Sequence, residues 1–252
     1  MSNPIQYQWR ITKYNPAYRN EYGHYLKDEW TSSSDIGKNI GGETLSLEDY
    51  LKVEAAYVDT IMKFIEANQI DVVRILTVSS SCSDKNSVLY DKEIETLSLK
   101  DDCEVPVAQV PLLAKMTLRE CIHCHFITKD FFVHFGYDYY MFIGSNSYVE
   151  EPIRFSEERG LFVEEMISDY YVEEKDLVRS VVWKEHEGEF GIGEEFLPAI
   201  DLDTYRQVLH LSDIHPVRGI FPITLDNKDF FQSKISHPID FTKYEYYLSV
   251  TE

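Results

Sequence analysis

Basic residues are scarce in this chain, which carries 24 Lys and Arg against 44 Asp and Glu in 252 residues and a formal net charge of −20. Direct binding to nucleic acid or to an anionic membrane surface depends on clustered Lys and Arg. We therefore expect neither a nucleic acid nor a membrane as a direct partner. A basic protein is the natural counterpart of such a chain.

Long apolar runs and cysteines are also few. No stretch of 18 apolar residues occurs, and no apolar segment follows a basic flank near Met1, so neither a membrane span nor a secretory signal is predicted. The four cysteines, Cys82, Cys103, Cys121 and Cys124, are too few for a disulfide framework and are expected to be reduced. We expect a soluble, cytoplasmic protein.

The sequence also lacks the motifs of common enzymes. It has no Gly-x-Gly-x-x-Gly, no phosphate loop and no Gly-x-Ser-x-Gly, which are the patterns that hold dinucleotides, phosphates and nucleophilic serines. We expect no cofactor and no established catalytic site.

What is present is the composition of a folded protein, with 44% hydrophobic and 14% aromatic residues. Apolar residues spaced three and four apart after Ser46 predict a long helix over 46–68. Strands are predicted at 7–12, 70–78, 177–183 and 244–250, and 204–211 fits either helix or strand. Alternating and β-branched patterns predict hairpins of 118–127 with 131–143 and of 153–155 with 161–165.

These elements indicate an α+β fold, a predominantly antiparallel sheet with one long N-terminal helix packed on it. A single domain over 1–252 is expected from the length. The alternative is a boundary in the polar loop 79–104, which would separate 1–78 from 105–252.

One cluster has the residue types of a metal site. Cys103, Cys121, Cys124 and His125 are soft ligands of the kind that bind zinc. In a strand, however, Cys121, His123 and His125 would share one face while Cys124 points to the other. We predict no metal, and Cys121 beside two histidines is equally weak as a nucleophile because catalytic bases are usually distant in sequence.

A second motif offers an alternative function. Val208 to His215 resembles the first box of the calcineurin-like metallophosphoesterases, in which a strand delivers an Asp-x-His pair, here Asp213 and His215, to a two-metal site. The later boxes of that family are absent. The alternative is therefore a metal-assisted hydrolase whose site the fold assembles from His134, His210, Asp213 and His215. A structural subunit is a second alternative.

The strongest functional signal is a concentration of negative charge. Seventeen acidic residues and only five basic ones lie between Glu150 and Asp203. Charge of this kind can form a solvated outer face that keeps an aromatic-rich protein in solution. It can also bind a partner, because acidic clusters accelerate association with basic proteins and aromatic residues beside them can anchor the contact. We expect a non-enzymatic binding protein, an immunity-type inhibitor of a nuclease or other toxin, or a nucleic-acid mimic. The predicted partner-binding residues are Glu150, Glu151, Phe155, Glu157, Glu158, Phe162, Glu164, Glu165, Tyr170, Tyr171, Glu173 and Glu174.

Overall fold

The chain divides into two compact units, which we call the first unit, Met1–Tyr170, and the second unit, Tyr171–Glu252. The structure is a computed structural model that describes residues 5–80, 82, 84–171, 176–186 and 192–251. Every strand pair it describes is antiparallel, which confirms the α+β class. The segment 79–104 lies inside the first unit, where Ile94 is buried in the core, so the units do not divide there.

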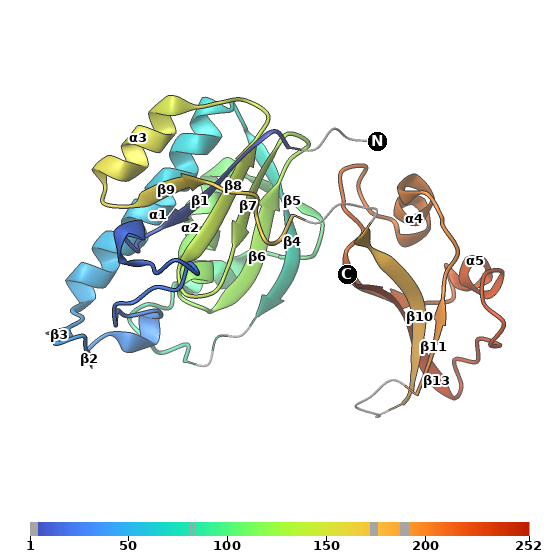
Figure 1. The fold of residues 1–252 in the computed structure, drawn as a ribbon. Helices are drawn as coiled ribbons and strands as arrows, with labels where there is room; N and C mark the ends of the chain where they lie inside the picture. The colour runs from blue at the N-terminus through green and yellow to red at the C-terminus, as the bar shows by residue number, and fades with distance from the viewer. Residues whose placement is uncertain (1–4, 81, 83, 172–175, 187–191, 252) are drawn as a thin grey trace. The chain divides into compact units, whose positions relative to one another are not determined.

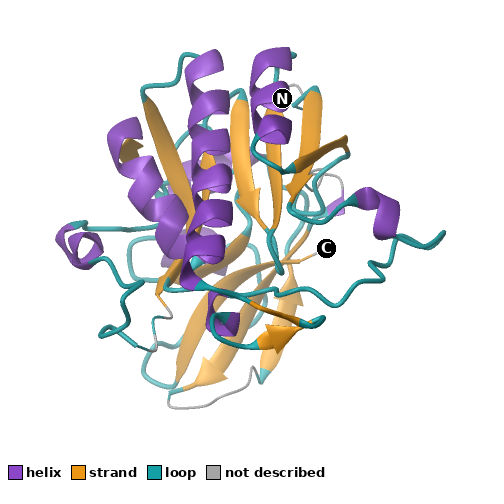
Figure 2. Cartoon of the chain, turned by 90° about the vertical axis from the view of Figure 1, so that its left-hand side faces the viewer, coloured by secondary structure: helices purple, strands orange, loops and turns teal. Residues whose placement is uncertain are grey.

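The first unit is built on a seven-stranded sheet in the order β5-β4-β6-β7-β8-β1-β9. Its strands are β1 (Tyr7–Thr12), β4 (Val72–Ser80), β5 (Cys103–Pro106), β6 (Ile122–Ile127), β7 (Phe131–Phe135), β8 (Tyr140–Ser145) and β9 (Phe162–Glu165). Helices α1 (Leu47–Ala67), α2 (Val110–Leu118) and α3 (Glu150–Glu158) lie along one face of this sheet (Figures 1 and 2). A small pair, β2 (Asn39–Ile40) and β3 (Glu43–Thr44), precedes α1.

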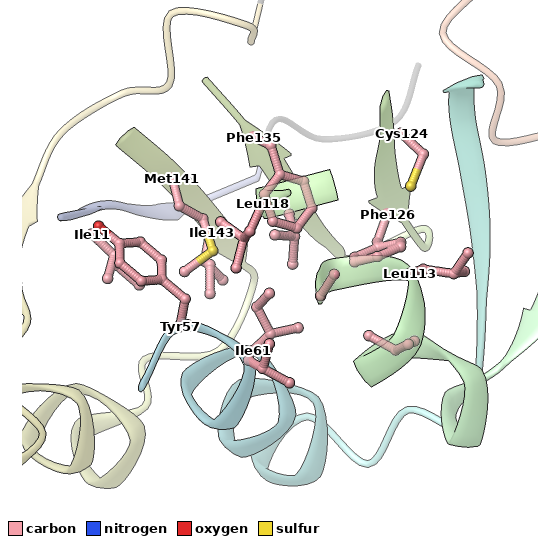
Figure 3. Packing of buried hydrophobic residues seen from close by; sticks show 14 of the residues in the cluster. Ile11, Tyr57, Ile61, Leu113, Leu118, Cys124, Phe126, Phe135, Met141 and Ile143 are labelled. Carbon is pink, nitrogen blue, oxygen red and sulfur yellow. The ribbon is translucent and has the colours of Figure 1, made fainter. Parts of the chain in front are cut away.

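Helix α1 begins where the sequence predicts. The Ser46 side chain accepts a hydrogen bond from the Asp49 backbone N–H at 3.0 Å and caps the first turn. Tyr57 and Ile61 on its buried side lie in the same apolar cluster as Met141 and other sheet residues (Figure 3). The apolar stripe of the helix is therefore a core stripe.

The predicted hairpin at 118–143 is confirmed at its turn and wrong in its arms. Strands β6 and β7 pair on either side of residues 128–130, but the second arm divides again to give β8. Asp138 and Tyr139 adopt the left-handed region, with φ of 53° and 62°, and turn the chain between β7 and β8. The first arm begins only at Ile122, because Leu118 ends α2.

The predicted hairpin at 153–165 is wrong. Residues 150–158 form α3, and Gly160, at φ +84°, lies just after its last turn rather than in a strand connection. The N–H groups of Gly160 and Leu161 donate to the carbonyls of Glu157 and Ser156, which is the Schellman pattern of a helix end. Strand β9 then pairs with β1.

The second unit has its own four-stranded sheet, in the order β11-β10-β13-β12, and its own core. Its elements are β10 (Val178–Glu185), β11 (Gly193–Phe196), α4 (Leu202–Leu209), β12 (Gly219–Ile223), α5 (Lys228–Gln232) and β13 (Tyr244–Thr251). The predicted strands 177–183 and 244–250 are confirmed, and 204–211 is largely helical. In neither unit is a described helix long and apolar enough to cross a membrane.

Met141 tests the position of the core, because its side chain is 0% exposed on β8. Met141→Asp would bury an unpaired carboxylate at a cost of several kcal/mol, on the order of the total stability of a domain. We expect the first unit to unfold, measured by thermal melts with circular dichroism. Tyr137→Asp, at a residue 86% exposed in the neighbouring turn, is the control and should melt like the wild type. A folded Met141→Asp variant would contradict this core.

Candidate functional site: the acidic segment

Five of the predicted partner-binding carboxylates lie together at one edge of the first unit. Glu150, Glu151, Glu157 and Glu158 belong to α3, and Glu165 ends β9, the last strand of the sheet. All five are exposed, and α3 packs beside β9. We call these five residues the acidic edge.

The few cations near the acidic edge neutralise it only weakly. The Glu151 carboxylate lies 3.8 Å from Lys63, and the Glu158 carboxylate lies 3.8 Å from Arg154. The side chains of Glu151 and Glu158 are 58% and 68% exposed. Ion pairs this long and this exposed contribute little to stability and are screened by salt.

Glu157 and Glu158 occupy the last turn of α3. The C-terminal end of a helix carries partial negative charge, so two carboxylates there are mildly unfavourable, by roughly 0.3–1 kcal/mol each at low salt. Helix stability therefore does not account for their presence.

Aromatic side chains lie beside these carboxylates. Phe155 is half-buried on α3, with the Arg159 guanidinium 4.5 Å from its ring centre, and Phe162 is half-buried on β9. Tyr148, which the sequence analysis did not select, is 54% exposed next to the start of α3 and packs against the rings of Tyr7 and Trp9 at 5.4 and 6.1 Å. The sequence does contain a signal for Tyr148, because this tyrosine lies only two residues before Glu150.

Glu164 differs from its neighbours because its carboxylate binds two arginines of the same unit. Its carboxylate accepts hydrogen bonds from Arg19 at 2.6 Å and from Arg10 at 3.0 Å. Arg10 is its cross-strand partner in β1. Burial opposes ionisation, but the hydrogen bonds from the two arginines lower the pKa of Glu164 below its usual value. We therefore leave Glu164 out of the acidic edge.

Tyr170 also packs within the first unit rather than beside α3. Its ring centre lies 5.5 Å from that of His125, 6.0 Å from that of His134 and 6.0 Å from that of Phe142. His134 Nδ1 lies 3.0 Å from the Ser168 hydroxyl, so these rings form a histidine and aromatic row across β6, β7 and β8. Tyr171 belongs to the second unit and is half-buried. Glu173 and Glu174 lie outside the described residues.

The four residues considered for zinc are not brought together. Cys124 is buried beside the Thr117 hydroxyl, whereas His125 Nδ1 accepts the Phe135 backbone N–H at 3.1 Å on the other face of the sheet. Cys121 lies next to Cys82. Within the part of the chain that the structure describes, no three His, Cys, Asp or Glu side chains are grouped as metal ligands.

The segment that resembles a metallophosphoesterase box has a different local structure. Val208 and Leu209 end helix α4, and His210 follows in the left-handed region, so no strand delivers Asp213 and His215. His215 is buried, and its Nδ1 accepts the Val217 N–H at 2.9 Å. Upstream of this segment, Asp201 caps α4 by accepting the Thr204 N–H.

The role of Glu164 predicts a pH-dependent effect. Glu164→Gln should destabilise the protein at pH 7 by on the order of 1–2 kcal/mol, because Arg10 and Arg19 lose an ionised acceptor. The lowered pKa means that this stabilisation is present above the unfolded value near 4.3 and is lost as pH falls through the lower folded value. Urea titrations from pH 7 to pH 3 should show the difference shrinking. Glu165→Gln, the exposed neighbour, should show no difference, and equal effects would contradict the distinction.

The match to a protein family falls within the second unit. Residues 178–249 match a family described as a domain of unknown function (DUF7683), a range that lies within Tyr171–Glu252. No curated protein matches the chain, and no solved structure matches it. The family match supports the division into two units and leaves the activity of both open.

Proposed function

We propose that this chain is a binding protein that engages a cationic protein through the acidic edge, as an immunity-type inhibitor of a toxin or as a nucleic-acid mimic. The observation that carries the proposal is the exposed set of carboxylates on α3 and β9, whose ion pairs within the described part of the chain are long and solvent-exposed. Such a surface raises the rate of encounter with a basic protein and selects against acidic ones.

The placement of charge within α3 adds to this argument. Glu150 and Glu151 lie in the first turn, where carboxylates favour the helix, but Glu157 and Glu158 lie in the last turn, where they do not. Carboxylates that make a helix slightly less stable are better explained by binding than by folding. This distinguishes Glu157 and Glu158 from Glu164, whose carboxylate meets two arginines of the same unit.

The aromatic contribution rests on Tyr148 and Phe155. Tyr148 packs edge-on against Tyr7 and at a tilt against the buried Trp9 next to the start of α3, and Phe155 lies on the helix itself. Interfaces draw most of their binding energy from a few aromatic or arginine anchors surrounded by polar contacts. A rigid aromatic beside solvated carboxylates fits a partner whose basic residues flank an apolar position.

The two alternatives have less support. For a metal-assisted hydrolase, His134 Nδ1 already lies 3.0 Å from the Ser168 hydroxyl, and His215 Nδ1 already accepts a backbone N–H. A structural subunit offers no reason for carboxylates in the last turn of α3. No described observation favours either alternative over binding.

A charge-reversal pair tests the location of binding. Glu157→Lys with Glu158→Lys is compared with Asp213→Lys with Asp226→Lys, which makes the same change in net charge at exposed residues of the second unit. The probe is a fluorescent oligolysine of about 20 residues, whose affinity should fall roughly tenfold for the α3 variant and less than about twofold for the control. Both variants should melt within a fraction of a kcal/mol of the wild type.

Salt dependence and neighbouring genes test the nature of the partner. Association should slow steeply as the Debye length contracts from about 10 Å at 0.1 M to about 3 Å at 1 M salt. Equal losses in both variants would show that net charge alone binds the probe. A basic toxin encoded beside this chain, inhibited by the wild type and not by the α3 variant, is the expected partner. Inhibition by both variants would overturn the assignment to the acidic edge.

A further inference from the structure

Two of the four cysteines lie side by side at the wall of a cavity in the first unit. The Sγ atoms of Cys82 and Cys121 are 2.7 Å apart. Both residues line a cavity of about 360 Å³ between the end of β4 and the segment that follows it. The remaining lining comes mainly from apolar side chains such as Ile94, Leu97 and Leu99.

Strand pairing brings the two thiols together. Ser80 in β4 is the register partner of Ile122 in β6, so Cys82 and Cys121 lie just beyond the paired ends of neighbouring strands. Glu120, at φ 59°, turns the chain from α2 into β6, and the Cys121 N–H donates to the Met116 carbonyl at 2.9 Å. The Cys121 backbone is therefore fixed between the end of α2 and the start of β6. Its thiol lies next to that of Cys82, 39 positions earlier in the chain.

We propose that Cys82 and Cys121 form an oxidative modification site, a dithiol that a small-molecule disulfide such as oxidised glutathione converts to an intramolecular disulfide. A disulfide bond needs its sulfurs at about 2.0 Å, so the two Sγ atoms, 2.7 Å apart, need to approach by less than 1 Å to close the bond. Both residues border the same cavity, through which a small disulfide would approach.

The two thiols have different roles in the exchange. Cys82 is half-buried, whereas Cys121 is 8% exposed. Burial, together with the hydrogen bond to Cys82, raises the pKa of the Cys121 thiol to about 12. A thiol that stays protonated is a poor first attacker. Cys82 therefore attacks the small disulfide, and Cys121 resolves the product.

The reaction balances in two steps. The Cys82 thiolate attacks one sulfur of the small disulfide, forms a mixed disulfide and releases one small thiolate. The Cys121 thiol then loses its proton as its sulfur attacks Cys82 Sγ and expels the second small thiolate. Two protein thiols are oxidised, and one disulfide molecule is reduced to two thiols.

The other two cysteines provide internal controls. Cys124 is 0% exposed, and its burial raises the pKa of its thiol to about 12, but its described sulfur contact is the Thr117 hydroxyl rather than another thiol. Cys103 is half-buried in β5. Neither should react with Cys82 or Cys121 in the folded protein.

The test is titration of the full chain with glutathione buffers of increasing oxidised fraction, followed by acid trapping, alkylation and mass spectrometry. The wild type should lose two free thiols and about 2 Da, with no retained glutathione. Tryptic cleavage leaves Cys121 and Cys124 on one peptide, since the nearest cleavage sites are Arg119 and Lys129. A Cys124→Ala background therefore assigns the bond.

Matched variants decide the outcome. Cys103→Ser should oxidise like the wild type, whereas Cys82→Ser and Cys121→Ala should form no intramolecular disulfide. Cys121→Ala should instead retain glutathione on Cys82. Oxidation should also raise the melting temperature of the wild type by several degrees, because the bond closes a long loop, and leave that of Cys82→Ser unchanged. A stable mixed disulfide in the wild type, a bond through Cys103 or Cys124, or free thiols throughout would overturn the proposal.

Discussion

The bidentate ion pair between Glu54 and Arg119 is the interaction on which the arrangement of the first unit depends. The Arg119 Nε and Nη2 atoms donate to the two carboxylate oxygens of Glu54 at 2.6 and 2.7 Å, and Nη1 donates to the Leu89 carbonyl at 2.6 Å. Both side chains are almost enclosed, with 3% and 11% exposure. A buried pair of this kind adds little net stability, but removing one partner leaves an uncompensated charge and costs about 3–5 kcal/mol. It therefore fixes α1, the end of α2 and the segment after β4 in one arrangement.

The same pair organises the polar groups around it. The Tyr50 hydroxyl donates to Glu54, and the Tyr139 hydroxyl contacts Tyr50 and the Leu118 carbonyl. Tyr57 in turn donates to the Tyr139 carbonyl. Tyr139 lies in the turn between β7 and β8, so this network connects the helix layer to the sheet. The hydroxyl groups of Tyr50, Tyr57 and Tyr139 all find their hydrogen-bond partners inside the core. Such networks specify one packing because alternatives would leave buried polar groups unpaired. The Cys82 and Cys121 site lies directly beside it, since Arg119 precedes Cys121 by two residues.

The sequence alone predicted only those elements whose residues interact with near neighbours in the chain. Helix α1 has a capped start and a regular apolar stripe, and β1 has a clear alternation, so both were located within one or two residues. The prediction of a hairpin within residues 150–165 was wrong because Gly160 favours a left-handed conformation, which occurs both in hairpin turns and at helix ends. The pairing of Glu164 with Arg10 and Arg19, and of Cys82 with Cys121, depends on strand register between distant segments. No spacing along the chain contains that information.

The directions in which side chains point explain why the charge of the sequence alone could not identify the acidic edge. Glu164 and Glu165 are adjacent in β9, yet the alternation of a strand gives one carboxylate two arginines of the sheet and leaves the other in solvent. In α3 the distinction comes from the helix end instead, where carboxylates are tolerated but not favoured. Glu164 has two short, shielded arginine partners, whereas the ion pairs described for the acidic edge are long and exposed. By that criterion the binding surface that we propose is narrower than the acidic segment, and it comprises carboxylates of α3 and β9. The thiol pair lies where β4 ends and β6 begins, near the opposite edge of the sheet, so oxidation there need not disturb the carboxylates of α3.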